Sequence, residues 1–107
     1  MSTPEGKVKN DVKRLLQANR VWHFCPVSNG LGVHGIPDFV CCIPTIVTPE
    51  MLGLTLGLFA GIETKAPGKI RNTSALQDKQ IAGIRAAGGV AVVVDSAELV
   101  RKLGVLP

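Results

Sequence analysis

The feature that most constrains this fold is an expected helix that ends in a double glycine and leads into an entirely apolar strand. The expected helix covers residues 75–87 and begins after a capping Thr73 or Ser74. It ends at Gly88-Gly89, and the strand that follows, residues 90–94, has the sequence VAVVV. Glycine ends helices because it adopts the left-handed conformation at no steric cost. A strand without polar residues is typical of one buried on both faces of a parallel sheet. The pattern predicts a right-handed β-α-β crossover, and with it an α/β domain.

The segments before this unit supply an N-terminal helix and three strands. Thr3-Pro4-Glu5 is a helix start, with Thr as the N-cap, Pro in the first turn and a carboxylate that suits the helix N-terminus. Apolar residues then recur at helical spacing to about Ala18. The other expected elements are strands at 21–25, 38–43 and 54–65, a turn at 50–53 and a last helix at 97–103. The order α-β-β-β-α-β-α predicts one domain, 1–107, with a mixed central β-sheet flanked by helices.

The composition indicates the kind of core and the kind of partner. Of 107 residues, 46% are hydrophobic and only 4% are aromatic, so we expect an aliphatic core. Twelve Lys and Arg against eight Asp and Glu give a net charge of +4, which suits a polyanionic partner without requiring one. The longest apolar run, 51–62, is too short to span a bilayer, and the charged N-terminus lacks the apolar stretch of a signal peptide. We therefore expect a cytoplasmic protein with no membrane partner.

The cysteines give no sign of a metal or disulfide framework. Cys25, Cys41 and Cys42 are odd in number, two are adjacent, and no CxxC spacing occurs. A zinc knuckle or a disulfide scaffold requires a different pattern. All three lie in apolar runs, so we expect them to be buried, reduced thiols.

Two acidic residues and one lysine occupy positions that point to chemistry. Asp38 stands where a glycine-rich loop enters an apolar strand, and Glu63 lies near the end of another. Lys65 follows Glu63 by two positions, which in a strand places both side chains on one face. Carboxylates are hard oxygen ligands for Mg²⁺, and a lysine beside them can orient water or offset charge at a scissile phosphate. Taken alone, the Glu-Thr-Lys triplet favours the plainer interpretation, in which Glu63 and Lys65 form a surface ion pair and Asp38 caps a turn, because such triplets are common.

Four short motifs follow one another in order and extend this reading. They are GIPDFV at 35–40, GIETK at 61–65, SALQ at 74–77 and AAGGV at 86–90. The ordered set resembles the VRR-NUC domain of the PD-(D/E)XK nuclease superfamily, particularly its compact stand-alone phage versions. The resemblance covers almost the whole chain and implies a restriction-endonuclease-like fold. For a phage-encoded chain, the expected location is the cytoplasm of the host cell.

The resemblance implies a role for each matching residue. It makes Asp38, Glu63, Lys65 and Gln77 the catalytic residues, with Gln80 as the alternative glutamine one turn later. It implies Mg²⁺ or Mn²⁺ as cofactor, held by Asp38 and Glu63. Glu5, on the first helix, either reaches this metal or is a plain first-turn carboxylate. The link at 42–58 is longer than usual for the family, and it adds either a hairpin or a dimer contact.

Several residues around this site are expected to contact nucleic acid. Lys69, Arg71 and Lys79 flank it and either steer phosphates or form a solvated face. His34 precedes Asp38 and is a candidate phosphate or base contact. The substrate path is completed by weaker candidates, Ser28 and Asn29. In contrast, we expect His23 and Trp22 to belong to the core or its edge.

The function implied is divalent-metal-dependent endonucleolytic cleavage of DNA. Stand-alone members of the family resemble Holliday-junction resolvases, so the expected substrate is branched DNA such as a four-way junction and the expected assembly is a homodimer. One alternative is a nuclease for flaps, nicks or duplex ends in phage DNA processing. Another is a non-catalytic DNA-binding module that kept the fold.

Overall fold

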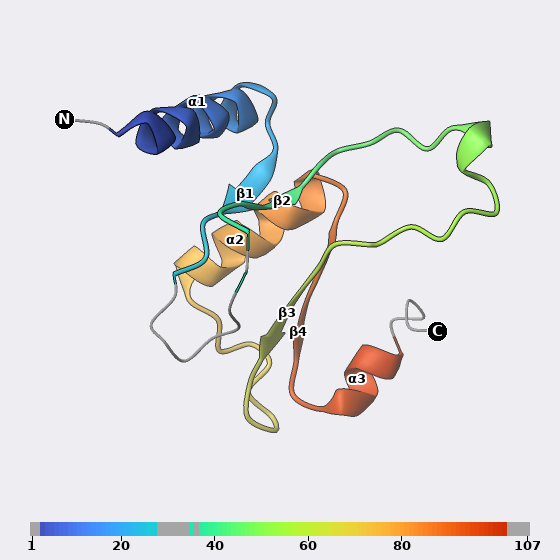
Figure 1. Ribbon diagram of the computed structural model, residues 1–107. Coiled ribbons are helices and arrows are strands. Elements are labelled where there is room, and N and C mark those ends of the chain that lie inside the picture. Colours follow the sequence, from blue (N-terminus) through green and yellow to red (C-terminus); the bar gives the residue numbers. More distant parts are fainter. Residues whose placement is uncertain (1–2, 28–34, 36, 103–107) are drawn as a thin grey trace.

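The computed structural model describes residues 3–27, 35 and 37–102 as a mixed α/β chain of three helices and two small sheets (Figure 1). The element order agrees with the expected α-β-β-β-α-β-α, with one additional 3-10 helix, η1, after the second strand. The bounds are α1 (Pro4–Ala18), β1 (Trp22–Phe24), β2 (Val40–Cys42), η1 (Pro49–Met51), β3 (Ala60–Thr64), α2 (Ala75–Ala86), β4 (Val90–Val94) and α3 (Ala97–Arg101).

The C-terminal unit is a parallel β-α-β arrangement, as the double glycine and the apolar strand predict. β3 and β4 pair in parallel with Glu63 opposite Val93, and α2 connects them. The pairing extends one residue past the strand, because the backbone N–H of Lys65 donates to the carbonyl of Val94 at 2.8 Å. Ile84 and Ala91 are buried where α2 covers this ladder, and Val94 is buried on the other face of β4, beside α3. This small aliphatic core fixes the helix on the strand that carries Glu63.

The ends of α2 follow from its sequence. Ser74 Oγ accepts the Gln77 backbone N–H, and the Gln77 side chain accepts the Ser74 N–H in return, which is a capping box. At the other end, Gly88 has a φ of 91°, and the N–H groups of Gly88 and Gly89 donate to the carbonyls of Arg85 and Ile84. This is the Schellman pattern, which satisfies carbonyls that the helix leaves open. The positive φ explains why the chain has a glycine at position 88.

The strands do not form the single mixed sheet that the sequence led us to expect. In the described residues, β1 pairs antiparallel with β2 in one two-stranded ladder, and β3 with β4 in another. Packing joins the two ladders: the Cys42 thiol is buried against the last carbonyls of α2, and the Trp22 ring lies 5.4 Å from that of Phe59. Within the described residues, side-chain packing and not backbone pairing therefore holds the two ladders together.

The expected strand at 54–65 is much shorter in the structure, which makes its predicted start wrong. Pairing with β4 begins at Ala60, after the Val90 N–H has bonded the Phe59 carbonyl. Because α2 and its two glycines run to position 89, β4 has only five residues to offer as partners. Residues 54–59 therefore lie outside the ladder.

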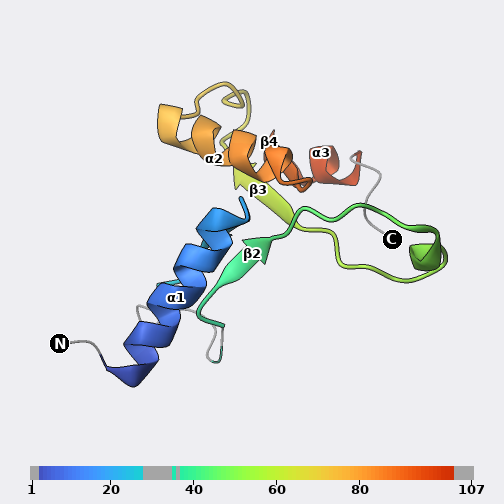
Figure 2. The ribbon, with the colours of Figure 1, turned by 90° about the horizontal axis from the view of Figure 1, so that it is seen from above.

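Residues 43–59, which we call the arm, project away from the rest of the molecule between β2 and β3 (Figures 1 and 2). The arm contains η1 and is otherwise without helix or strand. Its two ends meet the body at one place, since Cys42 and Phe59 both lie against Gly89-Val90. Cys42 is buried and Cys41 half-buried, whereas Cys25 is exposed, so the expectation of three buried thiols is wrong for Cys25.

Candidate functional site

Glu63 and Lys65 lie on one face at the end of β3, as their spacing predicts. Their side chains meet, with Lys65 Nζ 3.5 Å from Glu63 Oε1. Both are partly sheltered, since 18% of the Lys65 side chain and 35% of the Glu63 side chain is exposed. An ion pair this close to the core differs from an ordinary surface pair, because less water screens it.

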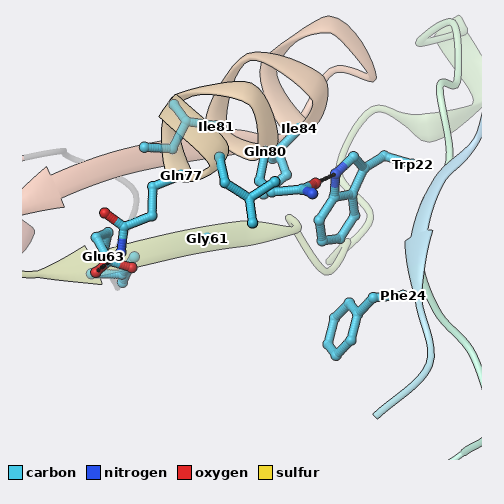
Figure 3. A pocket seen from close by; sticks show the side chains of 10 residues that line it. Trp22, Phe24, Gly61, Glu63, Gln77, Gln80, Ile81 and Ile84 are labelled. Carbon is cyan, nitrogen blue, oxygen red and sulfur yellow. Dashed lines mark hydrogen bonds between the residues drawn. The ribbon is translucent and has the colours of Figure 1, made fainter. Parts of the chain in front are cut away.

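Gln77 completes the cluster from the first turn of α2. Its Nε2 donates to Glu63 Oε1 at 2.9 Å, and both side chains are drawn in Figure 3. Its Oε1 accepts from Lys65 Nζ at 3.1 Å. The same Oε1 also accepts the Ser74 N–H at 3.0 Å. These contacts fix the carboxamide orientation, because its oxygen faces two donors and its nitrogen faces a carboxylate. The capping box of α2 thus holds the side chain that links Glu63 to Lys65.

This polar cluster lies at one end of an apolar groove of about 560 Å³. Trp22 and Phe24 of β1 line its far end, with their rings 5.7 Å apart in an edge-on arrangement (Figure 3). Strand β3 contributes Ile62 and Glu63 to the groove. The wall formed by α2 consists of Leu76, Gln77, Gln80, Ile81 and Ile84. Glu63 and Gln77 thus lie beside a surface that can accept an apolar or aromatic group, and Lys65 joins them through its contacts to both.

Asp38 and Glu5 lie outside this cluster. The Asp38 carboxylate forms an ion pair with Lys9 of α1 at 3.7 Å, and 60% of its side chain is exposed. Glu5 is exposed in the first turn of α1. Within residues 3–27, 35 and 37–102, no three His, Cys, Asp or Glu side chains come together as a metal-holding group. The structure therefore assembles the glutamate, lysine and glutamine of the expected site, and leaves its aspartate paired with α1.

The expected nucleic-acid contacts are distributed around the start of α2. Lys69, Arg71 and Lys79 are exposed, and the first two belong to the loop that joins β3 to α2. That loop is tethered to the end of β4, because the Gly68 N–H donates to the Asp95 carboxylate at 2.9 Å. Three further candidates lie outside the described residues, namely Ser28, Asn29 and His34.

The sequence reasoning missed how closely β1 approaches α2. Gln80 accepts a hydrogen bond from Trp22 Nε1 at 3.1 Å, so it holds the groove wall and does not reach Glu63. A Cβ at Gly83 would lie 2.9 Å from the Trp22 ring, and one at Gly61 would lie 2.9 Å from Ile84. A glycine inside a helix and one inside a strand were the available signals, because such positions often mark close approach.

No family model, curated protein or solved structure matches this chain. In the described residues, no helix has the length and apolarity needed to cross a membrane. The functional assignment therefore depends on the chemistry of the cluster formed by Glu63, Lys65 and Gln77. A carboxylate, an ammonium group and a carboxamide in mutual contact can hold a cation, position a water molecule and neutralise an anionic group.

Proposed function

We propose that this chain is a divalent-metal-dependent DNA endonuclease of the VRR-NUC type that hydrolyses phosphodiester bonds. The observation that carries the proposal is the contact of Glu63 and Lys65 on β3 with Gln77 on α2. The motif resemblance names the same three residues as parts of one site. Residues 12 and 14 positions apart in sequence have no local reason to share a hydrogen-bonded cluster, so their convergence supports the resemblance.

The donor set fits a Mg²⁺ or Mn²⁺ ion. Mg²⁺ binds one or two protein carboxylates and keeps several waters, so Glu63 and Asp38 are sufficient in kind and number. Among the described residues, both side-chain contacts to Glu63 reach Oε1 and none reaches Oε2. In the same part of the chain, the one ion pair of Asp38 is exposed, and such pairs are weak enough to be exchanged for a metal ligand. When bound, the metal would lower the pKa of a coordinated water and polarise the phosphate.

The protein groups around the ion have separate roles in this proposal. Glu63 holds the cation, and Gln77 keeps the Glu63 carboxylate in place through its amide nitrogen. The Lys65 ammonium faces the same carboxylate and offsets negative charge on the phosphate as it develops. The exposed Lys69, Arg71 and Lys79 attract the DNA backbone, whose affinity then depends on salt.

The test is a cleavage assay on the full chain with Mg²⁺ or Mn²⁺ and three DNA substrates: a four-way junction, a flap and a linear duplex. We expect metal-dependent cutting, with the junction preferred if two copies act together on two strands. Glu63→Gln, Asp38→Asn and Lys65→Met should each lower the rate by at least 100-fold, because each removes a group that acts on the metal or the phosphate.

A matched control and a binding measurement separate the alternatives. Lys13→Ala removes an exposed lysine of α1 to which the proposal gives no role, so it should leave the rate unchanged, whereas Lys79→Ala should weaken DNA binding and reduce its salt dependence. Equal cutting of all three substrates would favour a general processing nuclease over a junction-selective one. If the wild-type chain binds DNA but cuts none of the substrates with either metal, the chain is a non-catalytic DNA-binding module.

A further inference from the structure

The arm, residues 43–59, carries most of the exposed large apolar side chains in the described chain. Seven of thirteen such residues belong to it, with exposed fractions from 56% at Leu58 to 88% at Ile46. The other five in the arm are Ile43, Val47, Leu52, Leu54 and Leu56. Single exposed apolar residues are ordinary on soluble proteins, but a gathering of seven in one segment is the kind of surface that marks an interaction site.

The limb of the arm that leads into β3 has the character of an unpaired strand. Leucine occupies positions 54, 56 and 58, and in an extended chain this spacing places the three side chains on one face. Within the described part of the chain, no backbone group from Thr55 to Leu58 takes part in a backbone–backbone hydrogen bond. A segment with apolar alternation and free backbone groups is a template for pairing with another chain.

The exposed area of the chain indicates how much surface a partner could cover. The chain exposes 8693 Å², whereas a compact monomer of 11.3 kDa exposes about 5,700 Å². The radius of gyration is 16.6 Å, against about 13 Å for a compact domain of this length. The excess of roughly 3,000 Å² per chain is well above the ~800 Å² per partner that a standard interface buries, so one chain has enough surplus surface for a second copy to cover.

The near absence of charge in the arm indicates what kind of partner it can bind. Glu50 is the only charged residue between positions 43 and 59, so the arm offers nothing to a polyanion such as DNA. A second copy of this chain presents the same uncharged, leucine-lined segment. Two identical segments can pair around a two-fold axis, because each offers the other unpaired backbone groups and an apolar face to cover.

We propose that the arm is the interface through which two copies of this chain form a dimer, with the limb at 54–58 of each copy paired against its counterpart. The pairing satisfies the backbone groups of Thr55 to Leu58 and covers the leucine face. Because this limb continues directly into β3, the same stretch of chain carries the dimer interface and then Glu63. The interface holds whether or not the Glu63 cluster cuts DNA.

The first test is the molar mass of the full chain in solution, measured by light scattering after size exclusion. We expect twice the 11.3 kDa chain mass for the wild type and the single-chain mass for Leu56→Glu. Val8→Glu is the matched control, since Val8 and Leu56 are 60% and 59% exposed and only Leu56 belongs to the arm. It should remain a dimer. A wild type of single-chain mass, or a dimer with another protein only, would overturn the proposal.

Hydrogen exchange provides a second measurement that does not depend on a variant that folds. The amides of Thr55 to Leu58 have no backbone partner within the described residues of one chain and should be protected only in the dimer. We expect protection at concentrations where the wild type is dimeric and its loss on dilution. If these amides exchange at the rate of an unstructured peptide in the dimer, the interface lies elsewhere. Neither measurement involves metal or DNA, so failure here leaves the nuclease proposal unchanged.

Discussion

At the level of single residues, the Gln77 carboxamide connects helix formation to the candidate site. It closes the capping box with Ser74 and also bridges Glu63 and Lys65. Its oxygen faces two donors, so its orientation is fixed before any ligand binds. Glu63 and Lys65 therefore meet in a defined geometry although both side chains are partly accessible to water.

We predict that Gln77→Ala lowers the free energy of unfolding by about 1–2 kcal/mol, because it removes the side-chain half of the capping box and the hydrogen bonds to Glu63 and Lys65. Gln77→Glu should cost less, since a carboxylate still accepts from Ser74 and Lys65, although it repels Glu63. Urea unfolding of the two variants and of Lys79→Ala provides the measurement. Lys79 is exposed on the same helix, so its replacement should stay within about 0.5 kcal/mol of the wild type. A Gln77→Ala change as small as that of the control contradicts the bridging role.

At the level of elements, the turn from α2 into β4 decides how the two ladders pack. Gly88 turns the chain with its positive φ, and Gly89 lets three segments approach each other. A Cβ at Gly89 would lie 2.8 Å from Ile84 Cγ2 and 2.9 Å from Cys42 Sγ. Gly88 is therefore required by its backbone conformation, and Gly89 by the lack of space for a side chain.

We predict that Gly89→Ala destabilises the fold more than Gly88→Ala does. At Gly88 the added methyl meets nothing within 4 Å, and the cost is the strain of the left-handed conformation, about 1 kcal/mol. At Gly89 buried neighbours must move, which typically costs 1–3 kcal/mol. The expected order appears as a lower thermal midpoint for Gly89→Ala. Equal midpoints would mean that Cys42 and Ile84 do not pack closely on this turn.

At the scale of the whole molecule, a small core is combined with a long apolar projection. The buried apolar side chains among the described residues are Cys42, Ile84, Ala87, Ala91 and Val94. Four of them lie where α2 meets β2 and β4, and Val94 lies on the other face of β4, beside α3. Such a core supplies little stabilisation alone, because small domains bury a small fraction of their surface. Covering the arm with a second copy adds apolar burial that the single chain lacks.

We predict that the thermal midpoint of the wild type rises with protein concentration. A partner that binds only the folded chain stabilises it by mass action, so a 100-fold higher concentration should shift the midpoint upward by several degrees. Leu56→Glu should show a midpoint that does not change with concentration. Scanning calorimetry or circular dichroism melts across that range provide the measurement. A constant midpoint for the wild type would contradict stabilisation by self-association.

Local chemistry explains which parts of the fold were predictable from the sequence. Capping by Thr3 and Ser74, helix termination at Gly88-Gly89 and parallel pairing of β3 with β4 each depend on residues close in sequence or on a general rule of handedness. The contact of Glu63 with Lys65 followed from the alternation of a strand. The single mixed sheet and the long strand from residue 54 were wrong, because strand length and sheet membership depend on partners distant in sequence.

Neighbouring residues were enough to predict the helices with their caps, the β-α-β unit, and Glu63 and Lys65 on one face at the end of a strand. Three features emerged only in the folded chain: Gln77 contacts both of these residues, Asp38 pairs with Lys9, and residues 43–59 leave the body as an apolar arm. The difference arises because caps and alternation act within a few residues. The other features depend on which surfaces meet after α2 has packed on β3 and β4.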